Sequence, residues 1–274
     1  MIKKGIRGHD VRAEGLGNIV TKMSEFGIEY VQLVLERSAA GFTQGAFTPE
    51  YAEEIRASLG ETKIAVLGSY INPSARDPEQ RAGEIAKFKE KIQYAKILKP
   101  LAVGTETGFF GDSLATADND SEEAYNHVLG TMREIVADAE KNGVNVAIEG
   151  VAIFVINSPA KMARIVKDLA SDNVKVIFDP VNYINENNYE SQDDIINDTF
   201  ALLSDKLVAI HAKDFAVTDG KISFPDPGLG SLNYKLIFEN MKKYNVNPPI
   251  IMEGIDEQRA KDSFARLEKI KEGV

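Results

Sequence analysis

The sequence predicts a (β/α)8 barrel, and three observations support this. Short apolar runs alternate with longer segments of helical spacing, and eight such strand–helix units fit into the 274 residues. Strands that alternate with helices form a parallel sheet, because each connection must cross that sheet. Eight units in about 250 residues are typical of this barrel. The alternative is a doubly wound sheet, but its glycine fingerprint is missing: Gly228-Leu229-Gly230 follows a loop and lacks the third glycine.

The first four units are predicted from strand-like runs followed by helix-start signals. A helix is expected at residues 16–26, and Thr48, Asp77 and Ser121 are expected to cap the next three, with proline following the first two. The expected strands are residues 2–8, 29–35, 63–67 and 101–104.

The last four units follow the same pattern. Ser158 and Asp256 are expected helix caps, and residues 215–230, which carry Gly, Pro and Asp, are expected to form a loop. The expected strands are residues 144–148, 174–178, 207–210 and 249–252. No linker-like stretch interrupts the series, so one domain over residues 1–274 is expected.

Composition narrows the class of protein. The formal net charge is −10, which argues against nucleic acid as a partner, because non-specific binding relies on excess Lys and Arg. The absence of cysteine excludes thiolate metal sites and cysteine nucleophiles. No apolar run is long enough to span a membrane, and the basic N-terminus lacks the apolar core of a signal peptide. A cytoplasmic protein with no membrane partner is expected; a homo-oligomer is left open.

Four polar residues end four consecutive predicted strands: Glu149, Asp179, His211 and Glu253. In a barrel the carboxyl ends of the strands converge on one mouth. Each residue by itself also has an ordinary structural explanation, such as a turn carboxylate or a hydrogen-bonded core histidine. Three carboxylates beside one imidazole repel each other, and a divalent ion removes that repulsion. This ligand set suits Mn²⁺, Mg²⁺ or Co²⁺, and Zn²⁺ also accepts it.

The segments VAIEG (146–150), VIFDPVN (176–182), AIHAKDF (209–215), PDPGLG (225–230) and IIMEG closing at Gly254 resemble the xylose isomerase-like barrel superfamily, in its sugar phosphate isomerase/epimerase branch. The resemblance covers nearly the whole chain. It implies that Glu149, Asp179, His211 and Glu253 bind one divalent metal, and that Glu149 and Glu253 transfer the proton.

The chain departs from that family at three places. The ketose 3-epimerases usually carry His where this sequence has Asn182, and Asn-His where it has Gly150-Val151. They also carry an Arg shortly after the metal-binding His, where Lys213 is the nearby cation. These differences argue against epimerisation of a free hexulose and leave the metal ligands intact.

The expected reaction is proton transfer through an enediolate of a small-molecule sugar or sugar phosphate, stabilised by the metal. Isomerisation, epimerisation and dehydration all follow from that intermediate. A dehydratase of a cyclic polyol ketone and a non-catalytic sugar-binding module are therefore the alternatives. An apurinic endonuclease would need a histidine-rich metal cluster and a basic groove, and this acidic chain has three histidines.

Substrate contacts are expected from four further residues: Asn182, Lys213, Asn72 and His9. Each has a structural alternative. Asn182 could be a turn residue, Lys213 could pair with Asp214 or with a carboxylate of the mouth, and His9 could be a surface turn residue. Glu36 and Glu106, which also end predicted strands, are weaker candidates.

Overall fold

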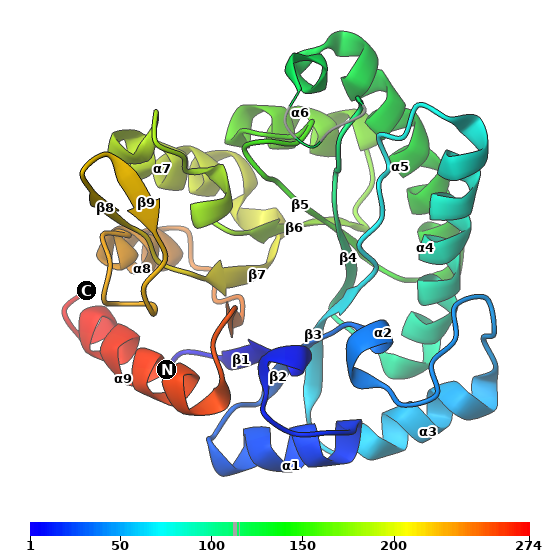
Figure 1. The fold of residues 1–274 in the computed structure, drawn as a ribbon, viewed down its shortest axis with the longest axis horizontal. Helices are drawn as coiled ribbons and strands as arrows, with labels where there is room; N and C mark the ends of the chain where they lie inside the picture. Colours follow the sequence, from blue (N-terminus) through cyan, green and yellow to red (C-terminus); the bar gives the residue numbers. More distant parts are fainter. Residues whose placement is uncertain (112–113, 115) are drawn as a thin grey trace.

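In the computed structural model, which describes residues 1–111, 114 and 116–274, eight parallel strands close into a barrel surrounded by helices (Figure 1). The predicted (β/α)8 barrel is therefore confirmed. In their order around the barrel the strands are β1 (Lys4–Arg7), β10 (Ile250–Met252), β7 (Leu207–Ala212), β6 (Val174–Phe178), β5 (Val146–Glu149), β4 (Ala102–Glu106), β3 (Lys63–Gly68) and β2 (Tyr30–Leu33).

A helix of ten residues or more follows each barrel strand and packs its apolar face against the outside of the barrel. These helices are α1 (Leu16–Glu25), α3 (Pro49–Leu59), α4 (Pro78–Leu98), α5 (Glu122–Asn142), α6 (Pro159–Leu169), α7 (Gln192–Leu203), α8 (Tyr234–Lys243) and α9 (Glu257–Glu272). The five predicted caps are confirmed, because each side chain accepts a hydrogen bond from a first-turn N–H: Thr48, Asp77, Ser121, Ser158 and Asp256.

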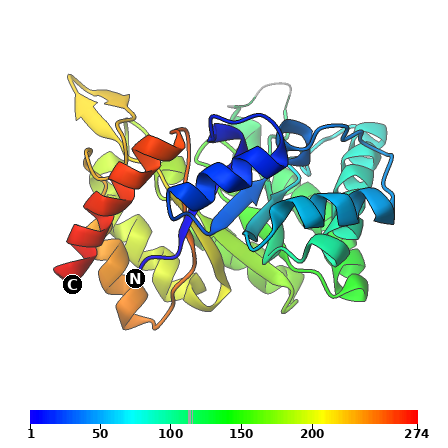
Figure 2. The same cartoon turned by 90° about the horizontal axis from the view of Figure 1, so that it is seen from below.

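Two sequence-based expectations about local structure were wrong. Glu36 does not end a strand: β2 stops at Leu33, and Glu36 lies in the short helix α2 (Leu35–Ser38). The segment 215–230 is not purely a loop, because it contains the antiparallel hairpin of β8 (Ala216–Thr218) and β9 (Lys221–Ser223). Figure 2 shows this hairpin standing away from the barrel. Helix α2 has four residues and each strand of the hairpin has three, so these elements are too short for a periodic pattern to emerge.

The inward side chains of the barrel form two layers. The lower layer is apolar and includes Ala147, Ile177, Ala209 and Ile251. Side chains alternate between the two faces of a strand, so the next inward position on each strand lies two residues further on. For β5, β6, β7 and β10 these positions are Glu149, Asp179, His211 and Glu253. The barrel therefore carries a polar layer directly above its apolar floor.

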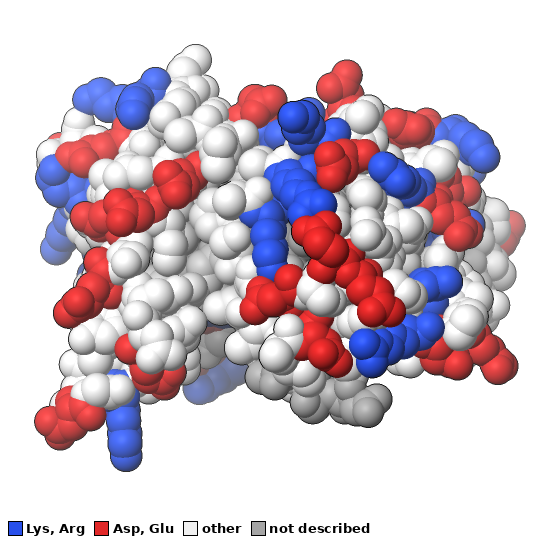
Figure 3. Space-filling view, turned by 90° about the horizontal axis from the view of Figure 1, so that it is seen from above, with Lys and Arg blue, Asp and Glu red and all other residues white. Residues whose placement is uncertain are grey.

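Acidic and basic side chains are interspersed over the face of the molecule seen in Figure 3. Ion pairs join neighbouring helices, as between Arg164 of α6 and Glu122 of α5, 2.6 Å apart. Among the described residues, no helix combines the length and the apolar character needed to cross a membrane.

Candidate metal centre

Glu149, Asp179, His211 and Glu253 meet at the mouth of the barrel, and we call them the strand-end cluster. One potential ligand atom from each lies within 4.8 Å of all the others. His211 and Ile251 are register partners on β7 and β10, which places Glu253 two residues beyond that pair. The structure thus brings together the four residues that the sequence predicted to converge.

Nδ1 of His211 lies at the centre of the strand-end cluster. It is 3.1 Å from Glu149 Oε1, 3.1 Å from Glu253 Oε2 and 3.7 Å from Asp179 Oδ2. Glu149 and Glu253 come from strands separated by β6 and β7, so they approach the imidazole from different parts of the wall. All but Glu253 are almost completely buried, and the Glu253 side chain is 13% exposed.

The other imidazole nitrogen of His211, Nε2, contacts Gln32. His211 Nε2 lies 2.6 Å from Oε1 of Gln32, a buried residue of β2. The amide nitrogen of Gln32 in turn donates to the Tyr70 hydroxyl. Because the Gln32 oxygen can only accept, Nε2 carries a proton, and Nδ1 is the nitrogen directed at the carboxylates.

Asp179 combines a turn with a place in the cluster. Its Oδ1 accepts the backbone N–H groups of Val181 and Asn182, at 2.9 and 3.1 Å. Its Oδ2 is buried and has no hydrogen-bond partner among the described residues. Lys213 Nζ is 2.9 Å from Oδ2, but outside the alignment of a hydrogen bond. The turn predicted as the structural alternative is real, and it leaves the second oxygen directed into the cluster.

Lys213 and Asn182 hold the carboxylates in place. Lys213 Nζ lies 2.7 Å from Glu253 Oε1 and donates to Asn182 Oδ1 at 2.9 Å. The Asn182 amide nitrogen donates to Glu149 Oε1 at 2.8 Å. Arg7 of β1 supplies a second cation, 2.8 Å from Glu253 Oε1. Asn182 and Lys213, which were predicted to contact the substrate, therefore direct their polar side-chain atoms at the carboxylates of the cluster and at each other.

Mutual attraction among these groups outweighs the cost of burying them. Burial opposes protonation of His211, yet the neighbouring carboxylates of Glu149, Asp179 and Glu253 raise the pKa of the imidazole well above its ordinary value. Burial also opposes ionisation of Glu253 and Asp179, but His211 and Lys213 lower the pKa of both carboxyl groups. The same carboxylates raise the pKa of Lys213 despite its burial.

The donor set fits a divalent cation. One imidazole nitrogen and three carboxylates converge, the unbonded lone pairs of Asp179 Oδ2 face them, and the imidazole is oriented from behind by Gln32. Lys213 and Arg7 contribute positive charge at the edge of the cluster, beside Asp179 and Glu253. Part of the Lys213 side chain, 23%, is exposed.

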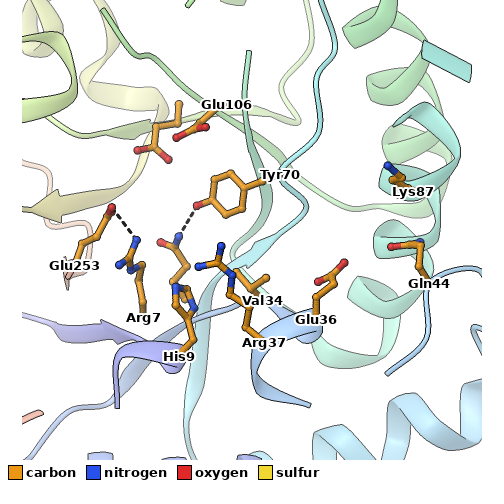
Figure 4. A pocket seen from close by; sticks show the side chains of 12 residues that line it. Arg7, His9, Val34, Glu36, Arg37, Gln44, Tyr70, Lys87, Glu106 and Glu253 are labelled. Carbon is orange, nitrogen blue, oxygen red and sulfur yellow. Dashed lines mark hydrogen bonds and ion pairs between the residues drawn. The ribbon is translucent and has the colours of Figure 1, made fainter. Parts of the chain in front are cut away.

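A cavity of about 570 Å³ opens beside the cluster, within the range of about 300–1,000 Å³ common for ligand sites. Glu149, Glu253, His9 and Glu106 are among its lining residues, and Figure 4 shows Glu253 at one end of it. Burial and the neighbouring Glu149 raise the pKa of Glu106 to about 7. His9 lies in the 3₁₀ turn η1 (Gly8–Asp10), as its structural alternative supposed, and it also lines this cavity.

Asn72 is not placed where the sequence suggested. Its amide nitrogen donates to the Phe109 carbonyl at 3.0 Å, and its Oδ1 accepts the backbone N–H groups of Phe109 and Ser74. It does not line the cavity beside the cluster. Asn72 joins two loops, and a role in substrate binding gains no support from its contacts.

Lys213 does not pair with Asp214, which was one of the expected alternatives. The buried Asp214 accepts four backbone N–H groups, from Phe215 and Leu232 on Oδ1 and from Gly228 and Gly230 on Oδ2. A Cβ at Gly230 would stand 2.3 Å from Asp214 Oδ1, so only glycine permits this approach. The PDPGLG segment is therefore a loop folded around one carboxylate.

Arg7 and Gln32 were not predicted from the sequence, although a signal was present. Both occupy the inward position at the end of their strands, in the same layer as Glu106 and Glu149, which are register partners. Arg7 and Gln32 are themselves paired in register on β1 and β2. Applying the two-residue alternation to every strand would have found them, but it requires strand ends known to within one residue.

Three comparisons place the chain among known proteins. A family model described as xylose isomerase-like TIM barrel matches residues 20–272. A search of the curated proteins found no match.

Among solved structures, a D-tagatose 3-epimerase-like protein aligns with a TM-score of 0.79 at 20% identity, over 100% of this chain and 98% of the other. D-Psicose 3-epimerase from Clostridium cellulolyticum H10, solved with D-tagatose, aligns with a TM-score of 0.75 at 17% identity, covering 100% and 99%. The IOLI protein with a bound zinc atom aligns with a TM-score of 0.76 at 16% identity, covering 98% and 96%. At these identities the alignments establish a shared fold.

Proposed function

Because the chain belongs to the xylose isomerase-like TIM barrel family, we propose that it is a divalent-metal-dependent isomerase or epimerase of a sugar or sugar phosphate. The observation that carries the proposal is the strand-end cluster, whose four ligand atoms lie within 4.8 Å of one another at the inner end of a cavity. Two structures with the same fold support it: a D-psicose 3-epimerase solved with D-tagatose, and a protein named as D-tagatose 3-epimerase-like.

We assign the metal to Glu149, Asp179, His211 and Glu253. Mn²⁺, Mg²⁺ and Co²⁺ suit this set of mainly oxygen ligands, and Zn²⁺ is a further candidate because the IOLI structure contains a bound zinc atom. A divalent ion held there would polarise the carbonyl and neighbouring hydroxyl of a ketose and offset the charge that develops as a carbon-bound proton leaves.

The chain's own groups are arranged to move that proton. Glu149 and Glu253 approach His211 from different strands and both line the cavity, so one carboxylate can remove a proton and the other can return it. Asn182 holds Glu149, while Lys213 and Arg7 hold Glu253 and keep it ionised. The two bases are thereby fixed before the substrate arrives.

The test is proton NMR in D₂O of the Mg²⁺-loaded protein with ketoses, their phosphates and inososes. We expect deuterium to enter a carbon next to the carbonyl. Inverted configuration at that carbon identifies an epimerase, and an aldose product identifies an isomerase. Loss of water would replace the proposal with a dehydratase, and no exchange with any compound would replace it with a sugar-binding module.

A further inference from the structure

The cavity beside the strand-end cluster has one basic side. Arg7, His9 and Arg37 project into it from β1, η1 and α2, and we call these three residues the basic wall (Figure 4). The turn η1 packs against α2, which brings His9 and Arg37 together. The opposite side carries Tyr70 and Glu106. A ligand in this cavity therefore meets the cluster at one end and cationic groups along its flank.

Arg37 is the cation of this wall that is free to bind a ligand. Arg7 is committed to Asp10, at 2.7 Å, and to Glu253, at 2.8 Å. Over residues 1–111, 114 and 116–274, the Arg37 side chain has neither an ion-pair partner nor a hydrogen bond, and the residue is exposed. Its neighbour Glu36 does not neutralise it, because the Glu36 carboxylate is paired with the buried Lys91 at 2.7 Å.

His9 is a second group without a partner. Both of its ring nitrogens are shielded from solvent, and neither makes a hydrogen bond within the described part of the chain. An unbonded buried N–H costs roughly 1–3 kcal/mol. An acceptor in the cavity that His9 lines would remove that cost once the imidazole ring turns a nitrogen toward it. Burial, followed by the positive charge of Arg7, lowers the pKa of His9. Arg37 lowers this pKa as well, so both arginines of the wall act on His9.

We propose that Arg37 and His9 bind an anionic group of the substrate, a phosphate ester or a carboxylate, while the ketose part of the same molecule lies at the strand-end cluster. The guanidinium offers a fork of N–H donors matched to two anionic oxygens, and the imidazole offers one more. This inference rests on the proposed function and narrows its substrate to an acidic sugar.

Two kinds of measurement test the inference. In the first, the deuterium-exchange assay gives KM for a ketose phosphate, for a keto sugar acid and for the neutral ketose of the same carbon chain. Arg37→Gln should lower the preference for an anionic over the neutral compound by about tenfold or more. Arg37→Lys should restore part of that preference, since it returns a point charge without the fork. The better of the two acidic substrates identifies phosphate or carboxylate as the natural group.

The matched control is Arg133→Gln, which makes the same charge change on the exposed face of α5, away from the cavity. It should leave the preference within about twofold of wild type. An unchanged preference in Arg37→Gln, or an equal loss in Arg133→Gln, would overturn the subsite.

The second measurement needs no turnover and so separates this inference from the proposed function. Inorganic phosphate is titrated into the Mg²⁺-loaded protein and followed by ³¹P NMR. Wild type and Arg133→Gln should bind it, whereas Arg37→Gln and His9→Phe should bind it at least about tenfold more weakly. Phosphate binding that is unchanged in Arg37→Gln would place the anion elsewhere and overturn the inference. If phosphate binds as expected but no ketose exchanges deuterium, the proposed function fails while the anion site stands.

Discussion

Nε2 of His211 lies 2.6 Å from Oε1 of Gln32, and this contact decides which imidazole nitrogen faces the three carboxylates. The two residues are far apart in the chain and meet because β7 and β2 belong to the same closed barrel. A glutamine oxygen cannot donate, so it leaves Nδ1 free to act as a ligand.

Replacing Gln32 by leucine should weaken metal binding by about 10–100-fold, the range typical when an outer-shell partner is lost. Leucine has a similar size but no acceptor, so the imidazole loses its fixed orientation. Calorimetric titration with Mn²⁺ measures the effect. Gln258→Leu, on the exposed side of α9, is the control and should titrate like wild type. Equal affinity in the two variants would remove Gln32 from the site.

Asp179→Asn should reduce metal affinity more than the Gln32 change does, because it replaces a ligand. The fold should survive, since the asparagine oxygen can still accept from the Val181 and Asn182 backbone. Elemental analysis of the purified protein gives the metal content. Asp120→Asn, which alters a surface pair with Lys161, controls for the loss of one charge. Full metal content in Asp179→Asn would contradict the four-ligand assignment.

Glu253→Gln should slow exchange of solvent deuterium into the substrate by roughly 10²–10⁴-fold, the usual contribution of a positioned base. The shape of the side chain is kept, and the amide oxygen can still accept from Arg7 and Lys213. NMR follows the exchange, with metal content measured on the same sample. Glu268→Gln, whose partner is Lys4 on the outside of the barrel, should exchange normally. Rapid exchange by a metal-loaded Glu253→Gln protein would exclude the catalytic role.

Asp214→Ala should lower the free energy of unfolding by about 2–5 kcal/mol, because four backbone N–H groups that donate to this carboxylate in the wild type lose their acceptor. Asp226→Ala, in the same loop, removes only a partly exposed pair with Arg259 and should cost less than about 1 kcal/mol. Urea unfolding compares the two. Similar losses would mean that Asp214 does not organise the loop.

The elements followed from local patterns in the sequence. Caps such as Thr48, Asp77 and Ser121 act within three residues of themselves, so they could be recognised without knowing the fold. The strand ends at Glu149, Asp179, His211 and Glu253 were also visible, since the barrel's topology requires such ends to converge. Shorter features were not recognised: α2 and the β8–β9 hairpin span too few residues for a period to show.

The sequence by itself determined the alternation of strands and helices and the four residues predicted to end consecutive strands. Both can be recognised from residues that are neighbours along the chain. Only the tertiary structure decided what those residues touch. Closure of the barrel sets β1 and β2 near β7 and β10, and this brings Gln32 to His211 and Arg7 to Glu253. Such contacts depend on strand register, where a shift of one residue turns every side chain to the other face. The candidate ligands could therefore be predicted from the chain, while the groups that orient them required the fold.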